Sequence, residues 1–100
     1  MAKKLEPVHP GELLLEAFLV PLELSPNALA RGIGVAPRRI KEIVHGTRRV
    51  TTDTAVRLAR FFGTSSQFWL ALQMDYALDT ESDRLQGRLE KEVRAYQGAG

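Results

Sequence analysis

Residues 25–50 constrain the fold of this chain more than any other stretch, because they pair two short helical patterns across a glycine. Behind Ser25 and Pro26, apolar residues recur at helical spacing, as expected where a hydroxyl caps a helix and proline occupies its first turn. Gly34 can adopt the positive φ that ends such a helix, and Pro37 can begin the next one. The segment therefore predicts two short helices joined by a tight turn.

The second of these helices has one apolar and one polar side. At about 100° per residue, Ile40, Ile43 and Val44 form a single stripe suited to burial. An α-helix fits the major groove of B-DNA, where arginine can donate two hydrogen bonds to guanine and glutamate can accept one from cytosine N4. The sequence therefore indicates a DNA-reading helix-turn-helix whose best base-reading candidates are Arg38, Arg39 and Glu42.

The residues beside and after this helix suit contacts with the phosphate backbone. They supply ammonium, imidazole, hydroxyl and guanidinium groups, which are typical donors to phosphate oxygens. The predicted backbone contacts are Lys41, His45, Thr47, Arg48 and Arg49. The alternative is that Arg38 and Glu42, at i and i+4, form an ordinary surface ion pair, and that the two loop arginines are merely solvated.

Positive charge is concentrated around the predicted reading helix. The whole chain has a net charge of only +2. Residues 31–60 contain eight basic and two acidic side chains and so carry +6, whereas residues 1–30 and 61–100 each carry −2. A positive field confined to this segment favours attraction to phosphate over a generally basic surface.

Length and composition exclude several classes of protein. A chain of 100 residues with 44% hydrophobic side chains suits one domain. It contains no cysteine, which fits the cytoplasm, and no apolar run long enough to cross a membrane. His9 and His45 have no companions at metal-ligand spacing, and no P-loop or nucleophile elbow occurs. We therefore expect no enzyme activity, no cofactor or metal, and no membrane partner.

Helical patterns fill the rest of the chain. Expected helices run from Pro10 to just before Pro21, from Thr51 or Thr52 to Gly63, from a capping box at 64–67, and from Thr80 to Gln97. The predicted fold is all-α, a compact bundle of five to six helices. It divides into an N-terminal arm at 1–8, a helix-turn-helix domain at 9–78, and a C-terminal helix with a frayed tail at 79–100.

Two apolar stripes in the last third of the chain have alternative interpretations. The first either completes the core or forms a dimer interface, because large aromatic residues on a terminal helix often cannot all be buried in a small domain. It comprises Phe68, Trp69, Leu72 and Tyr76. The second, which also needs a partner surface, comprises Leu85, Leu89, Val93 and Tyr96. The first stripe is our preferred dimer interface, and the second is the alternative.

Several motifs together resemble the HigA family of antitoxins, which are helix-turn-helix proteins of the Xre/Cro type with a lambda-repressor-like fold. Besides the helix-turn-helix, these motifs are HPGE at 9–12, GTRRVT at 46–51, FGTS at 62–65, and FWLALQ at 68–73 followed by Tyr76. The resemblance covers about residues 8–78. It implies an antitoxin that neutralises a HigB toxin, a RelE-like ribonuclease that cleaves mRNA on the ribosome. It also implies a dimer that represses its own operon at a palindromic operator.

The resemblance also assigns roles to individual residues. It places Ala36 with the three base-reading candidates, and it places Ser25 and Asn27 near the DNA backbone together with Arg48 and Arg49. Position 36 is often Ser or Thr in this family, whereas alanine is a poor cap that can contact only a thymine methyl group. Two other functions fit the same sequence: a repressor without a toxin, and a module whose basic helix binds an acidic protein surface.

Overall fold

The computed structural model of the chain describes residues 7–98, and every regular element within that range is helical. The elements are α1 (Pro10–Leu13), η1 (Leu14–Leu19), α2 (Pro26–Ile33), α3 (Pro37–Val44), α4 (Thr52–Phe62), α5 (Ser66–Leu85) and α6 (Leu89–Glu92). The all-α prediction is therefore confirmed. Most of the arm expected at 1–8 lies outside the described residues.

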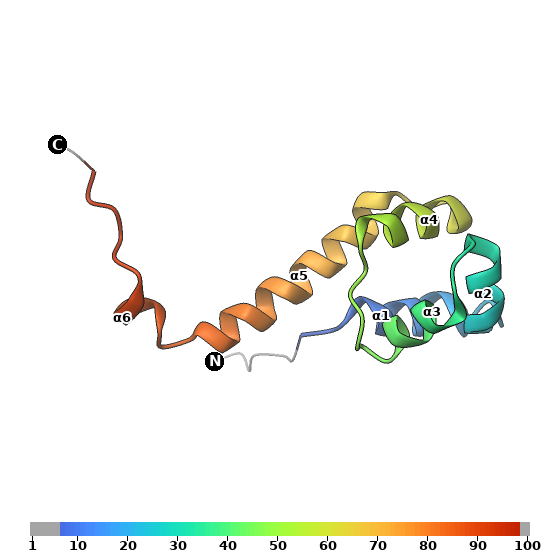
Figure 1. Cartoon of the computed structure of the whole chain (residues 1–100), viewed down its shortest axis with the longest axis horizontal. Helices are drawn as coiled ribbons and strands as arrows, with labels where there is room; N and C mark the ends of the chain where they lie inside the picture. Colours follow the sequence, from blue (N-terminus) through green and yellow to red (C-terminus); the bar gives the residue numbers. More distant parts are fainter. Residues whose placement is uncertain (1–6, 99–100) are drawn as a thin grey trace.

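The elements from α1 to α4, with η1 among them, and the start of α5 form a head, from which the rest of α5 extends (Figure 1). Within the head α2 packs on α3, α4 packs on α5, and α1 contacts both α3 and α5. The principal extents of 57, 33 and 23 Å reflect the projecting second half of α5 and the segment beyond it. The bundle is thus compact only in its head.

The helix-turn-helix forms where the sequence predicts it, for the predicted reasons. The Ser25 hydroxyl accepts a hydrogen bond from the Ala28 amide at 3.0 Å and caps α2. Gly34 ends that helix with a φ of 75°, in the left-handed region that favours glycine. Helix α3 begins at Pro37 after Ala36, which makes no side-chain capping bond. The predicted weakness of this cap is therefore present.

The first helix differs from expectation. After one α-helical turn it widens into the π-helix η1, in which the Val20 amide donates to the Leu15 carbonyl at 2.8 Å. This extra residue per turn rotates the following side chains relative to an α-helix. Ala17 is exposed, whereas the next residue, Phe18, reaches the aromatic cluster described below.

The core collects the apolar faces of all the head helices. Its largest fully buried side chain is Trp69, whose ring lies 5.1 Å from Phe18 and 6.2 Å from Phe62, measured between ring centroids. The indole N–H donates to the Thr64 hydroxyl at 2.8 Å, so its one polar group is satisfied. Assigning Trp69 to a dimer interface is therefore wrong, because its side chain has no accessible surface. It is a core residue.

Helix α5 is longer than predicted. The helix expected over Thr80 to Gln97 does not form, because α5 continues to Leu85 and only the short α6 follows. The Thr80 hydroxyl donates to the Tyr76 carbonyl inside α5 and caps nothing. The break comes near Gly87, which has a φ of 83°. Helix α5 therefore runs through residue 78, where the sequence places a domain boundary, and the division itself remains a prediction.

The capping box predicted at 64–67 is also shifted by one residue. The Ser65 hydroxyl caps α5 by accepting from the Phe68 amide at 3.1 Å, while Thr64 is occupied by Trp69. Helix α4 begins as predicted, with the Thr51 hydroxyl accepting from the Thr54 amide. Within residues 7–98, no helix is both long and apolar enough to cross a bilayer.

Candidate nucleic-acid interface

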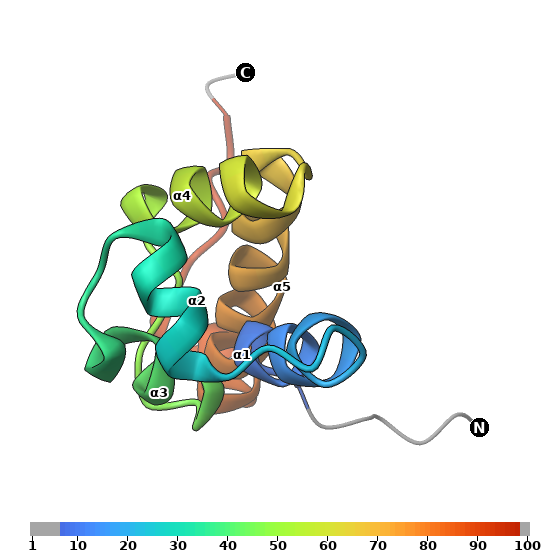
Figure 2. The same cartoon turned by 90° about the vertical axis from the view of Figure 1, so that its right-hand side faces the viewer.

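Helix α3 presents a polar face to solvent because its apolar face is anchored in the core. Ile40 and Ile43 are fully buried against the rest of the head. In Figure 2, α2 and α3 lie together on one side of the head, with α3 at its outer edge. Arg38 lies on this face with 83% of its side chain exposed. Helix α3 therefore has the amphipathic arrangement that a reading helix requires.

Glu42 is the centre of an ionic network on this face. Its Oε2 accepts from Arg38 Nε at 2.8 Å, and its Oε1 accepts from Arg48 Nε, also at 2.8 Å. These two guanidiniums hold the pKa of Glu42 below its usual range, and the same contact raises the pKa of Arg38. The sequence-based alternative of an Arg38–Glu42 surface pair thus describes only part of the arrangement, since Arg48 joins it.

Arg39 is held by the neighbouring helix α4. Its Nη1 donates to Asp53 Oδ2 at 2.6 Å, and the same nitrogen lies 3.4 Å from the Thr54 hydroxyl. Arg57, one turn further along α4, also donates to Asp53, and its Nη1 donates to the Ile33 carbonyl at the end of α2. Hydrogen bonds from Arg39 and Arg57 lower the pKa of Asp53. One carboxylate therefore connects the reading helix with the supporting helix.

The remaining predicted DNA contacts are all on the surface. Exposed residues among them are Ser25, Asn27, Ala36, Lys41, His45, Thr47, Arg48 and Arg49. The Thr47 hydroxyl donates to the Glu42 carbonyl at 3.2 Å, so the loop after α3 folds back on the end of that helix. The structure brings this loop and the exposed side of α3 together on one surface.

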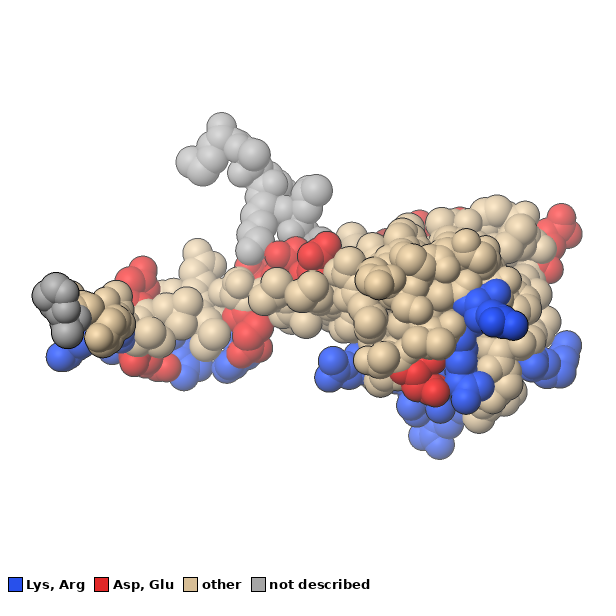
Figure 3. Space-filling view, turned by 90° about the horizontal axis from the view of Figure 1, so that it is seen from above, with Lys and Arg blue, Asp and Glu red and all other residues tan. Residues whose placement is uncertain are grey.

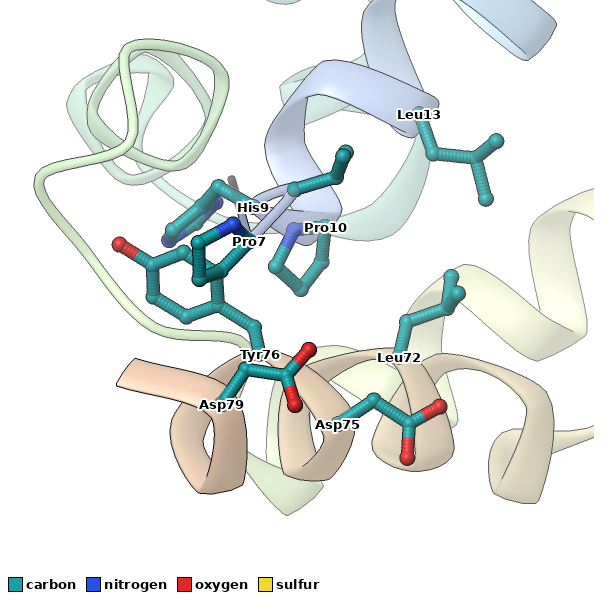
Figure 4. Close-up of a pocket in the computed structure, with 9 residues that line it drawn as sticks. Pro7, His9, Pro10, Leu13, Leu72, Asp75, Tyr76 and Asp79 are labelled. Atoms are coloured by element: carbon teal, nitrogen blue, oxygen red, sulfur yellow. The ribbon is translucent and has the colours of Figure 1, made fainter. Parts of the chain in front are cut away.

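The HPGE motif at 9–12 has a structural role that the sequence reasoning did not identify. His9 Nδ1 accepts from the Gly11 amide at 2.9 Å and caps α1. Its ring also meets the Tyr76 ring edge-on at 4.8 Å between centroids (Figure 4). Burial lowers the pKa of His9, and a hydrogen bond with the Arg48 backbone opposes part of this shift. His9 therefore joins α1, α5 and the loop after α3.

Gln73 is a second support that the sequence reasoning missed. It is buried, and its Oε1 accepts from the Val50 amide at 2.7 Å. Val50 follows the loop that carries Arg48 and Arg49, so this bond fixes the loop to α5. The signal available in the sequence was the glutamine that ends FWLALQ, a polar residue in an otherwise apolar run.

The head has a basic surface, and a separate pocket lies between the first residues and α5. Figure 3 shows most of the Lys and Arg side chains of the head gathered on one side of it. A pocket of about 310 Å³ lies between residues 7–13 and α5, where Leu72, Tyr76 and the acidic residues Asp75 and Asp79 line it (Figure 4). Among the described residues, no group of three or more His, Cys, Asp or Glu could hold a metal ion.

Known proteins resemble this chain in both sequence and fold. The helix-turn-helix family model matches residues 15–69. Virulence-associated protein I of Dichelobacter nodosus is 51% identical over 71 residues, which are 71% of this chain and 66% of that protein. The HTH-type transcriptional regulator YbaQ of Escherichia coli strain K12 is 40% identical over 68 residues, 68% of this chain and 60% of its own length. This chain therefore matches less than two thirds of either relative.

A solved structure described as Pseudomonas aeruginosa antitoxin HigA with higBA promoter superimposes with a TM-score of 0.85 and 41% identity. The superposition covers 88% of this chain and 96% of that one. The chain belongs to the helix-turn-helix family, and within that family to the HigA antitoxins.

Proposed function

We propose that this protein binds the operator of its own operon as a dimer and also neutralises a HigB-like toxin. The observation that carries DNA binding is the exposed face of α3, where Arg38 and Arg48 flank Glu42 beside Arg39. The similar Pseudomonas antitoxin was solved with promoter DNA, which supports DNA binding by this chain. Arg38 and Arg39 would contact bases, with Ala36 beside them, and the surrounding hydroxyl and basic residues would contact phosphates.

The test of DNA binding uses the duplex immediately upstream of this gene and a scrambled duplex of equal length and composition. Fluorescence anisotropy at several salt concentrations should give tighter binding to the upstream duplex, weakening as salt rises. Equal affinity for both duplexes would contradict sequence-specific binding. If binding did not depend on salt at all, the result would instead support the alternative in which the basic helix binds an acidic protein surface.

A dimer is required because a single reading helix contacts too few base pairs for selectivity. Two such helices about 34 Å apart would read the two halves of a palindrome. Leu72 and Tyr76 are half-buried, because their face of α5 is turned toward the head, and Phe68, although 37% exposed, packs its ring against Trp69. The opposite face carries Met74 and Leu78, which are 57% and 58% exposed. We infer that this face contacts the second copy.

The proposed dimer face can be tested by a charge in its centre. Leu78→Glu should convert the dimer to a monomer in light scattering and abolish cooperative binding to the upstream duplex. Val20→Glu, which alters an equally exposed apolar residue on the head, is the matched control and should leave the dimer intact. If the dimer survives Leu78→Glu, the dimer interface would instead be formed by the remaining residues of the first stripe or by the C-terminal residues.

The acidic side of α5 suits the toxin better than the basic side of the head does. An enzyme that cleaves RNA needs a cationic surface to bind phosphates. Asp75 and Asp79 are exposed beside the pocket, where Leu13 and Leu72 add apolar area. We infer that a basic surface of the toxin docks there. Such docking would leave the exposed side of α3 available to DNA.

Co-expression with the small open reading frame next to this gene tests the toxin partner. The unmodified protein should relieve growth arrest and co-purify with the product, whereas Asp75→Lys/Asp79→Lys should do neither and yet still bind DNA. Glu16→Lys/Glu90→Lys introduces the same charge change at other exposed positions and should behave like the parent. Absence of rescue by the parent protein would favour the repressor without a toxin, which the similarity to YbaQ also supports.

A further inference from the structure

Glu42 holds both the reading helix and the loop after it. Its two carboxylate oxygens accept from Arg38 and Arg48, which are ten residues apart in the chain. Its backbone carbonyl accepts from both the amide and the hydroxyl of Thr47, at 2.9 and 3.2 Å. Only 29% of the Glu42 side chain is exposed, which is much less than for Arg38. The residue is therefore more constrained than an ordinary helical surface pair.

The geometry leaves part of each arginine free. Both guanidiniums use Nε to contact Glu42, and no bond from their terminal nitrogens is present among the described residues. Arginine has five N–H donors in a fixed fork, so the two terminal amino groups remain able to donate together. Such a pair of donors matches O6 and N7 of guanine. Glu42 can thus orient both arginines without occupying the nitrogens that would contact DNA.

The same carboxylate opposes contacts that depend on charge alone. With Glu42 ionised, the three side chains carry a net charge of +1, whereas the two arginines by themselves would carry +2. A phosphate drawn to either guanidinium also approaches the Glu42 carboxylate and is repelled by it. Non-specific binding depends almost entirely on phosphate contacts. This repulsion therefore lowers the affinity for non-specific DNA more than the affinity for a site at which base contacts also contribute.

From these observations we propose that Glu42 is a specificity-determining positioning residue that acts through Arg38 and Arg48 rather than by reading a base itself. It directs the terminal nitrogens of Arg38 toward base edges, holds Arg48 in place beside them, and lowers the attraction of both arginines for phosphates of any sequence. This proposal rests on the proposed DNA binding and deepens it. It differs from the sequence-based role of Glu42 as an acceptor from cytosine, and the two roles predict opposite effects on non-specific DNA.

The test compares Glu42→Gln with the parent protein on the upstream duplex and on the scrambled duplex. Binding to the scrambled duplex should become about 3- to 10-fold tighter, and its salt slope should steepen by about one. Binding to the upstream duplex should gain less, so the ratio of the two affinities should fall. Glu90→Gln makes the same change in net charge on the distant α6 and should alter neither the ratio nor the slope.

A second comparison shows whether the effect passes through the arginines. In the Arg38→Ala/Arg48→Ala background, adding Glu42→Gln should change scrambled-duplex affinity no more than Glu90→Gln does. Thermal unfolding of each variant identifies any loss of fold, and Glu42→Ala repeats the measurement without an amide.

Three outcomes would overturn the proposal. The first is weaker binding by Glu42→Gln to the upstream duplex alone, which would identify a direct base contact. The second is equal behaviour of Glu42→Gln and Glu90→Gln, which would indicate a general charge effect. The third is persistence of the Glu42→Gln effect without the two arginines. If the parent protein itself prefers neither duplex, the proposed DNA binding fails first, and that result is distinct from all three.

Discussion

Gly11 lies so close to Ile43 that a Cβ atom at position 11 would fall 1.7 Å from the Ile43 carbonyl oxygen. The first turn of α1 is therefore pressed directly against the backbone in the last turn of α3. Only a residue without a side chain permits this approach. The HPGE motif thus sets the position of the reading helix, although none of its residues lies on the exposed face of α3.

Gly11→Ala should destabilise the protein strongly, because the added methyl group meets backbone that cannot rotate away. We expect a loss of about 1–3 kcal/mol or more in the free energy of unfolding, measured by urea denaturation. Gly32→Ala is the control. Its Cβ would lie 2.4 Å from the edge of the Phe61 ring, but that exposed side chain can move away, and alanine gains helix propensity there. Comparable losses in the two variants would argue against the backbone contact as the cause.

Gln73→Leu should also destabilise the head, because the Val50 amide would lose its acceptor. A buried donor left unsatisfied costs about 1–3 kcal/mol. Thermal unfolding should show the loss, and hydrogen exchange at the Val50 amide should accelerate. Gln67→Leu, at an exposed position in the first turn of α5, is the control and should leave both measurements nearly unchanged. Retained protection of the Val50 amide in Gln73→Leu would contradict the assigned bond.

Local signals account for the parts of the fold that the sequence predicts well. Ser25, Gly34 and Pro37 act within one or two turns of the helices they begin or end, so their effect is visible without knowledge of the packing. Thr80 misled the prediction because a threonine before acidic residues resembles an N-cap. Its hydroxyl instead bonds to the preceding turn, an option that only the continuous helix makes available.

The site also contains residues that local sequence predicts and residues that it does not. The polarity of α3 identifies its exposed arginines, since helical periodicity alone separates them from Ile40 and Ile43. Asp53, 14 residues beyond Arg39, becomes its partner only when the fold brings the first turn of α4 within reach of α3. The role of Gln73 likewise depends on a contact across 23 residues. Contacts of this separation follow from the tertiary arrangement, which no local pattern in the sequence specifies.

His9 should make stability depend on pH near neutrality. Its folded pKa is lowered from the usual value of 6.5, so the unfolded state binds more protons between the two values. The stabilisation is complete above about pH 6.5 and is lost as pH falls through the folded pKa. His9→Asn keeps a capping oxygen but does not titrate, and should flatten the pH profile of the melting temperature. His45→Asn, altering an exposed histidine, should leave that profile unchanged.

Arg39 and Arg48 should affect DNA binding in different ways. Arg39 projects from α3 beside Asp53, so Arg39→Ala should weaken binding to the upstream duplex about ten-fold or more and relax its base preference. Arg48 lies in the loop after α3, so Arg48→Ala should weaken binding to every duplex alike and reduce the salt slope by about one. Anisotropy titrations at fixed salt against single-base variants of the upstream duplex distinguish these effects. Arg94→Ala, at an exposed position beyond α6, controls for the loss of one positive charge.

If Arg39→Ala weakened all duplexes equally, Arg39 would be a phosphate contact. If the Arg48→Ala loss were confined to one base position, the assignment of Arg48 to the backbone would be wrong.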